Sequence, residues 1–284
     1  KMNPVNAYLG PFFEVALSAF IEAGYVALVY GGAEQGIYLC QHPLVEEIHI
    51  TGSDKTHDAI VYGVGDEGRQ NKVDDTPINT RRITSELGNV SPVIVVPGPW
   101  SASDIQFQAE NLASMLVNNA GFNCNATRVI ITHKGWDQRE ALLDAIRATL
   151  ADIETRAAYY PGANERHQAF LDAHPEAEFY GSPKEDELPW TFITGVEPNA
   201  EDICLSTEAF CGVFSEVPLE ASDTVSYINE AVRHCNETVW GTLNAAIIVH
   251  PRSTKEPGVQ QAVDDAVATL RYGAIGVNHW PAVS

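Results

Sequence analysis

The chain has 284 residues, of which 45% are hydrophobic and 19% are charged, a balance typical of a globular protein with a buried core. Acidic residues outnumber lysine and arginine by 38 to 17, and the resulting net charge of -21 argues against nucleic acid as a partner. No apolar run approaches the roughly 18 residues of a membrane-spanning helix, so we expect no membrane partner.

Strand and helix patterns alternate in the first part of the chain. Apolar residues recur with the helical period over 11–23, and Gly24 stands where that helix would stop. The polar stretch 63–82 contains glycine and proline and predicts a loop. The other elements predicted here are a strand over 26–30, a helix over 33–41, a strand over 45–50 and a helix over 54–62 capped by Ser53 or Asp54.

The alternation resumes around a second apolar core. The stretch 157–188 is rich in aromatic, proline and charged residues, and it predicts an irregular insert with one short helix near 167–173. Strands are predicted over 92–96, 128–133, 191–196, 210–216, 245–250 and 274–278, and helices over 103–117, 136–151, 225–234 and 259–272. The predicted fold class is therefore α/β with parallel strands.

The cysteines argue against two kinds of site. Their number is odd and no two form a CxxC pair, which excludes a disulfide framework and a structural zinc motif and favours a reducing, cytoplasmic location. The histidines His42, His49 and His57 are spaced too widely for a compact zinc motif, so no metal is predicted. The cysteines are Cys40, Cys124, Cys204, Cys211 and Cys235.

Two short segments contain residues that could carry covalent chemistry. Cys124 lies in a polar connection just before the strand over 128–133, whereas the other cysteines flank or lie in apolar runs. Upstream, Glu86 opens the segment 86–92, Glu-Leu-Gly-Asn-Val-Ser-Pro. A thiol becomes a nucleophile as thiolate, and a carboxylate that takes protons from a thiol or from water completes a covalent mechanism. The pair predicts an enzyme.

Together with 119–128, Asn-Ala-Gly-Phe-Asn-Cys-Asn-Ala-Thr-Arg, the segment 86–92 resembles the catalytic core of the aldehyde dehydrogenase superfamily. The resemblance implies that Cys124 is the catalytic nucleophile and that Glu86 is the general base that activates water. It covers nearly the whole chain.

Three residues beside these motifs depart from the family pattern and mark a divergent member. Phe122 stands where the family usually has Gln, and Asn89 and Val90 stand where it commonly has Gly and Lys. Glu86 and Cys124 themselves are kept. We infer no substrate from the departures.

The resemblance also implies contacts with a nicotinamide cofactor. The turn 51–53 lies between a strand and a helix, an arrangement that places phosphate on unpaired backbone N–H groups. The position where the family often has an acidic residue is Pro4, so NAD and NADP both stay open. The implied cofactor-binding residues are Lys1 on ribose, Gly52 and Ser53 on pyrophosphate, and Glu208 and Phe210 at the nicotinamide end.

A second glycine pattern, Gly-Val-Gly-Asp-Glu-Gly over 63–68, fits GxGxxG letter for letter. Dinucleotide-binding glycines lie between a strand and a helix, whereas these follow a predicted helix and lead into a polar stretch. We interpret the match as accidental.

The resemblance implies two domains and one activity. Residues 1–86 would be the C-terminal part of a Rossmann-like NAD(P)-binding domain and 87–284 an α/β catalytic domain that is incomplete at its C-terminus. The implied reaction is NAD(P)-dependent oxidation of an aldehyde to a carboxylic acid through a thioester on Cys124. The full-length protein is expected to be a homodimer or homotetramer. The family's oxyanion-binding asparagine would precede Lys1, so we expect this segment alone to be weakly active or inactive and prone to aggregate through uncovered edge strands.

Three alternatives stay open at this point. An acylating dehydrogenase would pass the acyl group to a thiol such as coenzyme A, although the presence of Glu86 argues against it. A non-catalytic relative would keep the fold as an oligomer or binding protein. A cysteine hydrolase would pair Cys124 with His133, but no third residue that would orient the histidine is evident.

Overall fold

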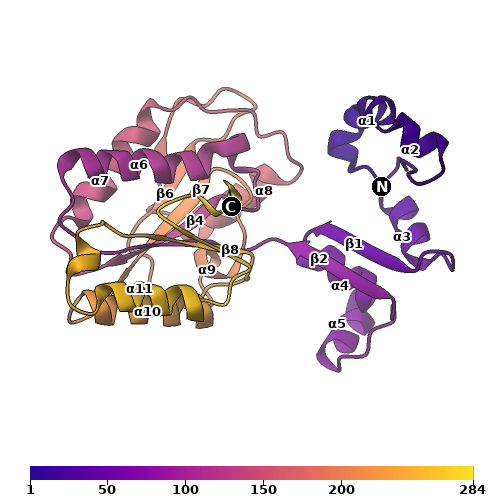
Figure 1. Cartoon of the computed structure of the whole chain (residues 1–284). Coiled ribbons are helices and arrows are strands. Elements are labelled where there is room, and N and C mark those ends of the chain that lie inside the picture. Colours follow the sequence, from indigo (N-terminus) through magenta and orange to yellow (C-terminus); the bar gives the residue numbers. More distant parts are fainter. Residues whose placement is uncertain (284) are drawn as a thin grey trace. The chain divides into compact units, whose positions relative to one another are not determined.

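The computed structural model describes residues 1–283 and divides the chain into two compact units, Lys1–Leu87 and Gly88–Ser284. Figure 1 shows helices and strands in both units, in agreement with the predicted α/β class. Among the described residues, no helix is both long enough and apolar enough to cross a membrane. The division lies next to the predicted boundary after residue 86, while the role of each unit stays a prediction.

The first unit contains one two-stranded parallel sheet and several short helices. Its strands are in register with Thr51 opposite Glu86 and Gly52 opposite Leu87. The elements are η1 Pro4–Leu9, α1 Gly10–Ala16, α2 Ser18–Glu22, α3 Ala33–Gln41, β1 Glu47–Gly52, α4 Asp54–Val61, α5 Gly65–Val73 and β2 Arg82–Leu87.

Three predictions in the first unit were wrong. The helix expected over 11–23 is interrupted at Leu17 between α1 and α2, and 26–30 forms no strand. The loop expected over 63–82 contains α5, whose sequence is too polar to show an apolar face. β2 was not predicted, and none of its six residues is buried. In each case the apolar pattern fails to report the backbone because so little of this unit is buried.

The GxGxxG match begins after the helix α4 and runs into the helix α5, so it does not follow a strand. Gly68 is buried within α5, and a Cβ placed on it would overlap the carbonyl group of Gly63. This glycine therefore permits the close approach of α5 to the preceding chain.

The second unit is built on a seven-stranded sheet in the order β5-β6-β7-β4-β3-β8-β9, parallel except for the edge strand β5. The strands are β3 Ser91–Val95, β4 Thr127–His133, β5 Glu178–Tyr180, β6 Trp190–Ile193, β7 Val213–Leu219, β8 Asn244–Ile248 and β9 Ala274–Val277. The helices are α6 Ala102–Val117, η2 Asn118–Gly121, α7 Arg139–Asp152, α8 Ala163–Ala173, α9 Ile203–Ser206, α10 Thr224–Glu237, η3 Ser253–Lys255, α11 Val259–Thr269 and η4 Pro281–Val283.

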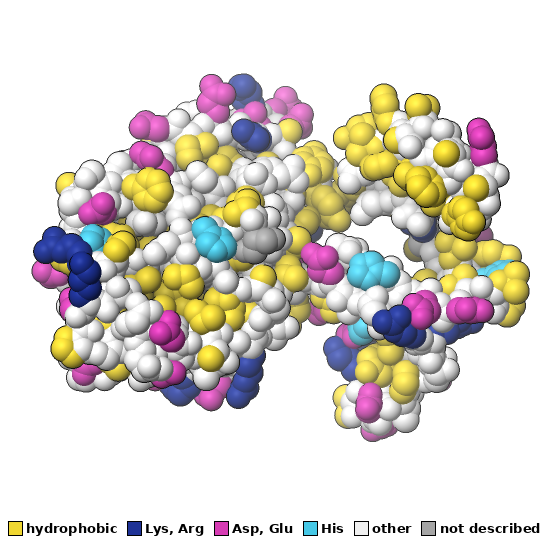
Figure 2. All heavy atoms as spheres, viewed as in Figure 1, with side chains coloured by type: hydrophobic (Ala, Val, Ile, Leu, Met, Phe, Trp, Pro, Cys, Tyr) yellow, Lys and Arg dark blue, Asp and Glu magenta, His cyan; other side chains and the backbone are white. Residues whose placement is uncertain are grey.

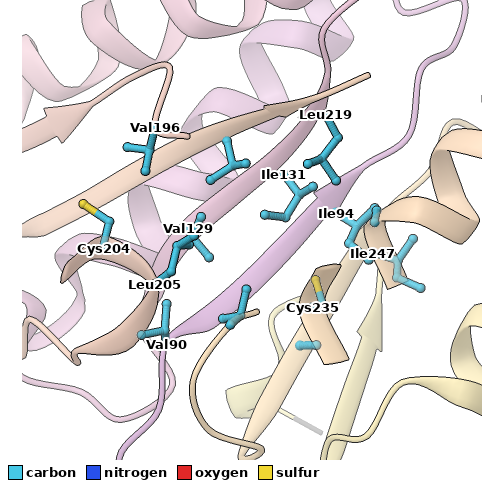
Figure 3. Close-up of a cluster of buried hydrophobic side chains, with 14 of the residues drawn as sticks. Val90, Ile94, Val129, Ile131, Val196, Cys204, Leu205, Leu219, Cys235 and Ile247 are labelled. Carbon is cyan, nitrogen blue, oxygen red and sulfur yellow. The ribbon is translucent and has the colours of Figure 1, made fainter. Parts of the chain in front are cut away.

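Helices cover both faces of this sheet, with α6 and α7 on one face and α10 and α11 on the other (Figure 1). Successive side chains of β4 point to opposite faces, so Val129 and Ile131 pack toward α10 and α11 while Ile130 packs toward α6 and α7. Figure 3 shows Val129 and Ile131 in the hydrophobic core on the side of α10 and α11, which also contains Cys204 and Cys235. Burial on both faces explains why the strands are continuous apolar runs.

The insert predicted over 157–188 is more regular than expected. Its helix begins earlier, at Ala163, and the stretch also contributes the antiparallel edge strand β5. Arg147 on α7 binds Glu178 on β5 through Nε and Nη2, at 2.8 and 3.0 Å. This three-residue strand is too short for a periodic pattern, and its attachment depends on an arginine distant in sequence.

Candidate active site

The predicted site residues of the second unit lie where neighbouring parallel strands begin. Cys124 lies shortly before β4, and Glu208 and Phe210 lie before β7, the strand beside β4. Gly88 and Asn89 lead into β3 on the other side of β4. The sheet thus brings these segments together at the amino ends of its strands, whereas ligands of open parallel sheets commonly bind at the carboxyl ends.

The loop before Cys124 has an uncommon backbone. Asn119, Ala120 and Gly121 have φ values of 52, 57 and 79°. The left-handed region is costly for residues with a Cβ, by about 1–2 kcal/mol each. The Asn119 amide stabilises the turn by donating to the carbonyl oxygen of Phe122 at 2.9 Å. At Gly121 a Cβ would lie 2.5 Å from the carbonyl oxygen of Cys211, so only glycine allows this approach.

Cys124 is half-buried, and its thiol and its carbonyl group each accept a hydrogen bond from an amide side chain. The Nδ2 of Asn125 donates to Cys124 Sγ at 3.5 Å. On the backbone side, the Cys124 carbonyl oxygen accepts from Asn89 Nδ2 at 3.2 Å and from Ser91 Oγ at 3.4 Å. The segment 86–92 therefore contacts the Cys124 loop through Asn89 and Ser91. From the sequence, Asn89 was noted only as a departure from the family motif and Ser91 only as part of it.

Arg128 is a buried cation that ties two loops together. Its guanidinium donates to the carbonyl oxygens of Gly121 and Cys211, each at 2.5 Å. Burial lowers the pKa of Arg128, and the nearby Glu208 and Cys124 oppose that shift. This residue ends the quoted Cys124 motif, but its role had been missed. A charged residue in an apolar strand is buried only where other groups pair with it. The position of Arg128 in the strand predicted over 128–133 was therefore a usable sign of this role.

Glu208 and Phe210 lie on the loop that Arg128 fastens to the Cys124 loop. A Cβ placed on Gly88 would overlap the Glu208 carboxylate, so Gly88 leaves the space that this carboxylate fills. Phe210 has a φ of 42°, and its ring lies 6.0 Å from that of Phe122 and 4.9 Å from that of Tyr160, measured between centroids. Phe122, which replaces the family's Gln, is thus part of an aromatic cluster beside Phe210.

Arg166 fixes the strained backbone at Phe210. Its Nε donates to the carbonyl oxygen of Ala209 at 3.0 Å, and its Nη2 donates to that of Phe210 at 3.3 Å. The same guanidinium lies over the ring of Tyr160, 6.0 Å from the centroid. A left-handed phenylalanine persists only when its surroundings hold it, and Arg166 provides that support.

The remaining predicted residues lie in the first unit. Glu86 lies on β2 opposite Thr51, so the two strand ends bring it beside the turn 51–53. Ser53 caps α4 by accepting a hydrogen bond from the N–H of Thr56 at 3.2 Å. Lys1 donates from Nζ to the carbonyl oxygen of Met2 at 3.3 Å.

The turn 51–53 can be tested for its fit to a phosphate. Gly52 and Ser53 are exposed, and a Cβ added to Gly52 would meet nothing closer than 3.8 Å. A ligand can therefore approach this backbone at the start of α4. Asp54, in the first helical turn, is the residue that opposes an anion there.

The pairing of Cys124 with His133 is excluded. Cys124 lies before the start of β4 and His133 is its last residue. The seven residues of this strand place the two roughly 20 Å apart. The His133 Nε2 instead forms a hydrogen bond with the carbonyl oxygen of Ala221 at 3.0 Å. This geometry removes the cysteine hydrolase interpretation.

A cluster of His174, Asp202 and Cys204 contains atoms of the kind that bind metals, all within 4.8 Å of one another. Burial lowers the pKa of His174, but hydrogen bonds from its two ring nitrogens to Glu176 at 2.8 Å and Asp202 at 3.1 Å outweigh it, and the net shift is upward. Burial also raises the pKa of Cys204. The cluster is therefore satisfied by hydrogen bonds between the His174 ring and two carboxylates, beside a buried thiol.

Comparisons with known proteins agree with the motifs. The model of the "Aldehyde dehydrogenase family" matches residues 3–162. A curated relative, 1-pyrroline-5-carboxylate dehydrogenase 2 of Bacillus subtilis, is 25% identical over 265 residues, which are 88% of this chain and 48% of the relative. The 4-trimethylaminobutyraldehyde dehydrogenase A of Danio rerio is 28% identical over 133 residues, 46% of this chain and 22% of that protein. The chain thus spans at most about half the length of these relatives.

Solved structures share the fold at low identity. The substrate-bound AldH of Staphylococcus aureus superposes with a TM-score of 0.72 at 17% identity, over 98% of this chain and 56% of that one. An indole-3-acetaldehyde dehydrogenase complexed with NAD+ gives a TM-score of 0.69 at 21% identity, over 92% of this chain and 51% of that one. With more than half of its residues matched by the family model, the chain belongs to the aldehyde dehydrogenase family.

Proposed function

We propose that this chain is the part of an NAD(P)-dependent aldehyde dehydrogenase that carries the nucleophile, and that Cys124 is that nucleophile. The supporting observation is the construction of its loop. Left-handed residues turn the chain, Gly121 allows the close approach of Cys211, and Arg128 fastens both loops while Asn125 donates to Cys124 Sγ. A cysteine that only fills space in a core does not require such support.

In the proposed reaction the Cys124 thiolate forms a C–S bond to the aldehyde carbon, and the carbonyl oxygen becomes an alkoxide. A nicotinamide dinucleotide held by the predicted cofactor-binding residues would supply the hydride acceptor, and loss of hydride from this carbon would leave the acyl group on Cys124 as a thioester. Glu86 takes a proton from water, which attacks the thioester, so that the C–S bond breaks and a carboxylate departs. One aldehyde, one NAD(P)+ and one water give one carboxylate, one NAD(P)H and two protons.

The residues that would hold the cofactor are divided between the two units. In the first unit, the open backbone of Gly52 and Ser53 fits a phosphate, and Lys1 is exposed for a ribose hydroxyl. In the second, Glu208 and Phe210 lie on the loop that Arg128 ties to the nucleophile loop. Solved relatives complexed with NAD+ and with NADP are both known, and neither dinucleotide is preferred here.

An assay that does not need the cofactor tests the role of Cys124 in this chain. The thiolate should attack the carbonyl carbon of p-nitrophenyl acetate, expel p-nitrophenolate and leave an acetyl group on Cys124. Peptide mass spectrometry locates the acetyl group, and p-nitrophenolate absorbance gives the rate. We expect Cys124→Ala to abolish the reaction at this position, with Cys235→Ala as a buried control.

The role of Glu86 and the redox step need a second measurement. With an aldehyde, NAD(P)+ and a high concentration of the chain, the weak NAD(P)H formation expected of this segment should be lost in Cys124→Ala. Glu86→Gln should give a burst without further turnover, because the thioester forms but water is no longer activated. NAD(P)H formation that persists unchanged in Cys124→Ala would refute the proposal.

A further inference from the structure

A buried polar network connects three adjacent strands at the side of the sheet where Cys124 lies. Asn89, Ser91 and Asn244 are 0, 2 and 2% exposed and lie where β3 and β8 begin. Ser91 Oγ accepts from Asn89 Nδ2 and from Asn244 Nδ2, each at 3.1 Å, and the Asn244 backbone N–H donates to Asn89 Oδ1 at 3.5 Å. The remaining donor capacity of Asn89 Nδ2 and Ser91 Oγ goes to the Cys124 carbonyl oxygen.

The space for Asn89 depends on Gly241. A Cβ at position 241 would overlap the Cα and Cβ of Asn89, and the φ of 93° at Gly241 is one that residues with a Cβ rarely adopt. Asn89 stands where the resembled family commonly has Gly, so its amide is an addition in this chain. It is placed in contact with the backbone of the nucleophile.

Asn125 contacts Cys124 from the sulfur side, and its own backbone is held at both ends. Its N–H donates to Asn123 Oδ1 at 2.8 Å, and its carbonyl oxygen accepts from Trp280 Nε1 at 2.7 Å. With the backbone held, the side-chain amide has few rotamers to search before it reaches Cys124 Sγ at 3.5 Å.

We propose that two amides act on the nucleophile: Asn125 is a catalytic residue that donates its N–H to the Cys124 thiolate, and Asn89 is a positioning residue that holds the Cys124 carbonyl. This proposal rests on the proposed function of Cys124. A donor that contacts the charged form of a group favours that form, so the Asn125 amide increases the fraction of thiolate. Asn89 keeps the Cys124 peptide in the orientation that leaves Sγ within reach of that amide.

The pH dependence of Cys124 alkylation by iodoacetamide in the full chain tests both roles, with peptide mass spectrometry to follow this cysteine alone. Asn125→Ala should move the midpoint of the alkylation profile upward by about one pH unit and slow alkylation at neutral pH by about tenfold. Its limiting rate at high pH should be unchanged, because the thiolate itself is the same.

Asn89→Ala should move the midpoint in the same direction. Because it acts through Asn125, the double variant should be shifted no further than the larger single shift. Asn89→Gly supplies the residue that the family commonly has, and it serves where the alanine variant does not fold. Thr191→Val is the matched control, because it removes a buried hydrogen bond to His167 and Thr191 lies on β6, which is separated from β4 by β7.

An unchanged midpoint in Asn125→Ala would overturn the catalytic role, and independent, additive shifts in the double variant would overturn the positioning role. A shift in Thr191→Val as large as those of the asparagine variants would reduce the effect to lost stability and overturn both. Alkylation requires neither aldehyde nor cofactor, so these outcomes are separate from the turnover assays. The proposed function fails only if Cys124→Ala keeps its activity.

Discussion

The two units differ in how much of their apolar surface is buried. Every buried hydrophobic side chain between residues 1 and 283 belongs to the second unit, and the first of them is Val90. In the first unit the large apolar groups are exposed, including Phe12 at 72%, Val15 at 78% and Tyr25 at 83%. Figure 2 shows hydrophobic side chains gathered over α1 and α2. Secondary structure is therefore present in both units, but only one of them has a core.

This difference in burial means that regular secondary structure does not by itself make a unit stable. A helix or a two-stranded sheet without a buried face gains little from its hydrogen bonds, since water satisfies the same groups in the unfolded chain. The second unit covers both faces of its sheet with helices. We infer that Gly88–Ser284 supplies most of the chain's free energy of folding, and that 1–87 is held by local contacts.

Hydrogen exchange tests this comparison with the largest expected effect. Amides of β3, β4 and β8 should exchange only through global opening, which for a domain of this kind costs about 5–10 kcal/mol. Amides of β1 and β2 should open with about 0–2 kcal/mol, so they should exchange at least about a hundredfold faster. Mass spectrometry of peptic peptides from the full chain measures both. Similar protection in the two sheets would contradict the inference.

Matched truncations sharpen the comparison at single side chains. Ile131 is 0% exposed in β4, and Ile131→Ala should lower the free energy of unfolding by about 2–5 kcal/mol. Ile37 is 56% exposed in α3, and Ile37→Ala should change it by less than about 0.5 kcal/mol. Urea unfolding followed by circular dichroism gives both values. A large loss at Ile37 would show that the first unit has a core of its own.

The same difference explains what sequence patterns could predict. The six strands predicted for the second unit each overlap an observed strand, because a strand that is buried on both faces has a continuous apolar sequence. They were predicted over 92–96, 128–133, 191–196, 210–216, 245–250 and 274–278. In the first unit the polar sequences of α5 and β2 carried no such signal, and the apolar run 26–30 joined no sheet. Periodicity reports burial, and it is informative only where burial decides the structure.

For the candidate site, motif resemblance predicted roles for Cys124 and Glu208, but it did not reveal which residues contact them. The contacts of Asn89 and Arg128 with the Cys124 loop depend on strand order and register, since β3 and β4 must be neighbours for Asn89 to reach the Cys124 carbonyl. No spacing of residues in the sequence predicts that β3 and β4 are neighbours. A buried arginine in an apolar strand was a usable signal, whereas an asparagine in place of a glycine was not.

The smallest expected effect concerns acid, and it should act on the second unit. His234 is 2% exposed, and burial lowers its pKa to about 4, so the folded unit keeps it neutral while the unfolded chain protonates it near pH 6.5. Since the unfolded state binds the extra proton, stability falls as the pH drops from about 6.5 to about 4 and levels off below. The loss approaches about 3 kcal/mol, at about 1.4 kcal/mol per pKa unit. His234→Gln should flatten this part of the pH dependence in urea unfolding. An equal slope in His234→Gln would mean that another group in the second unit takes up the proton.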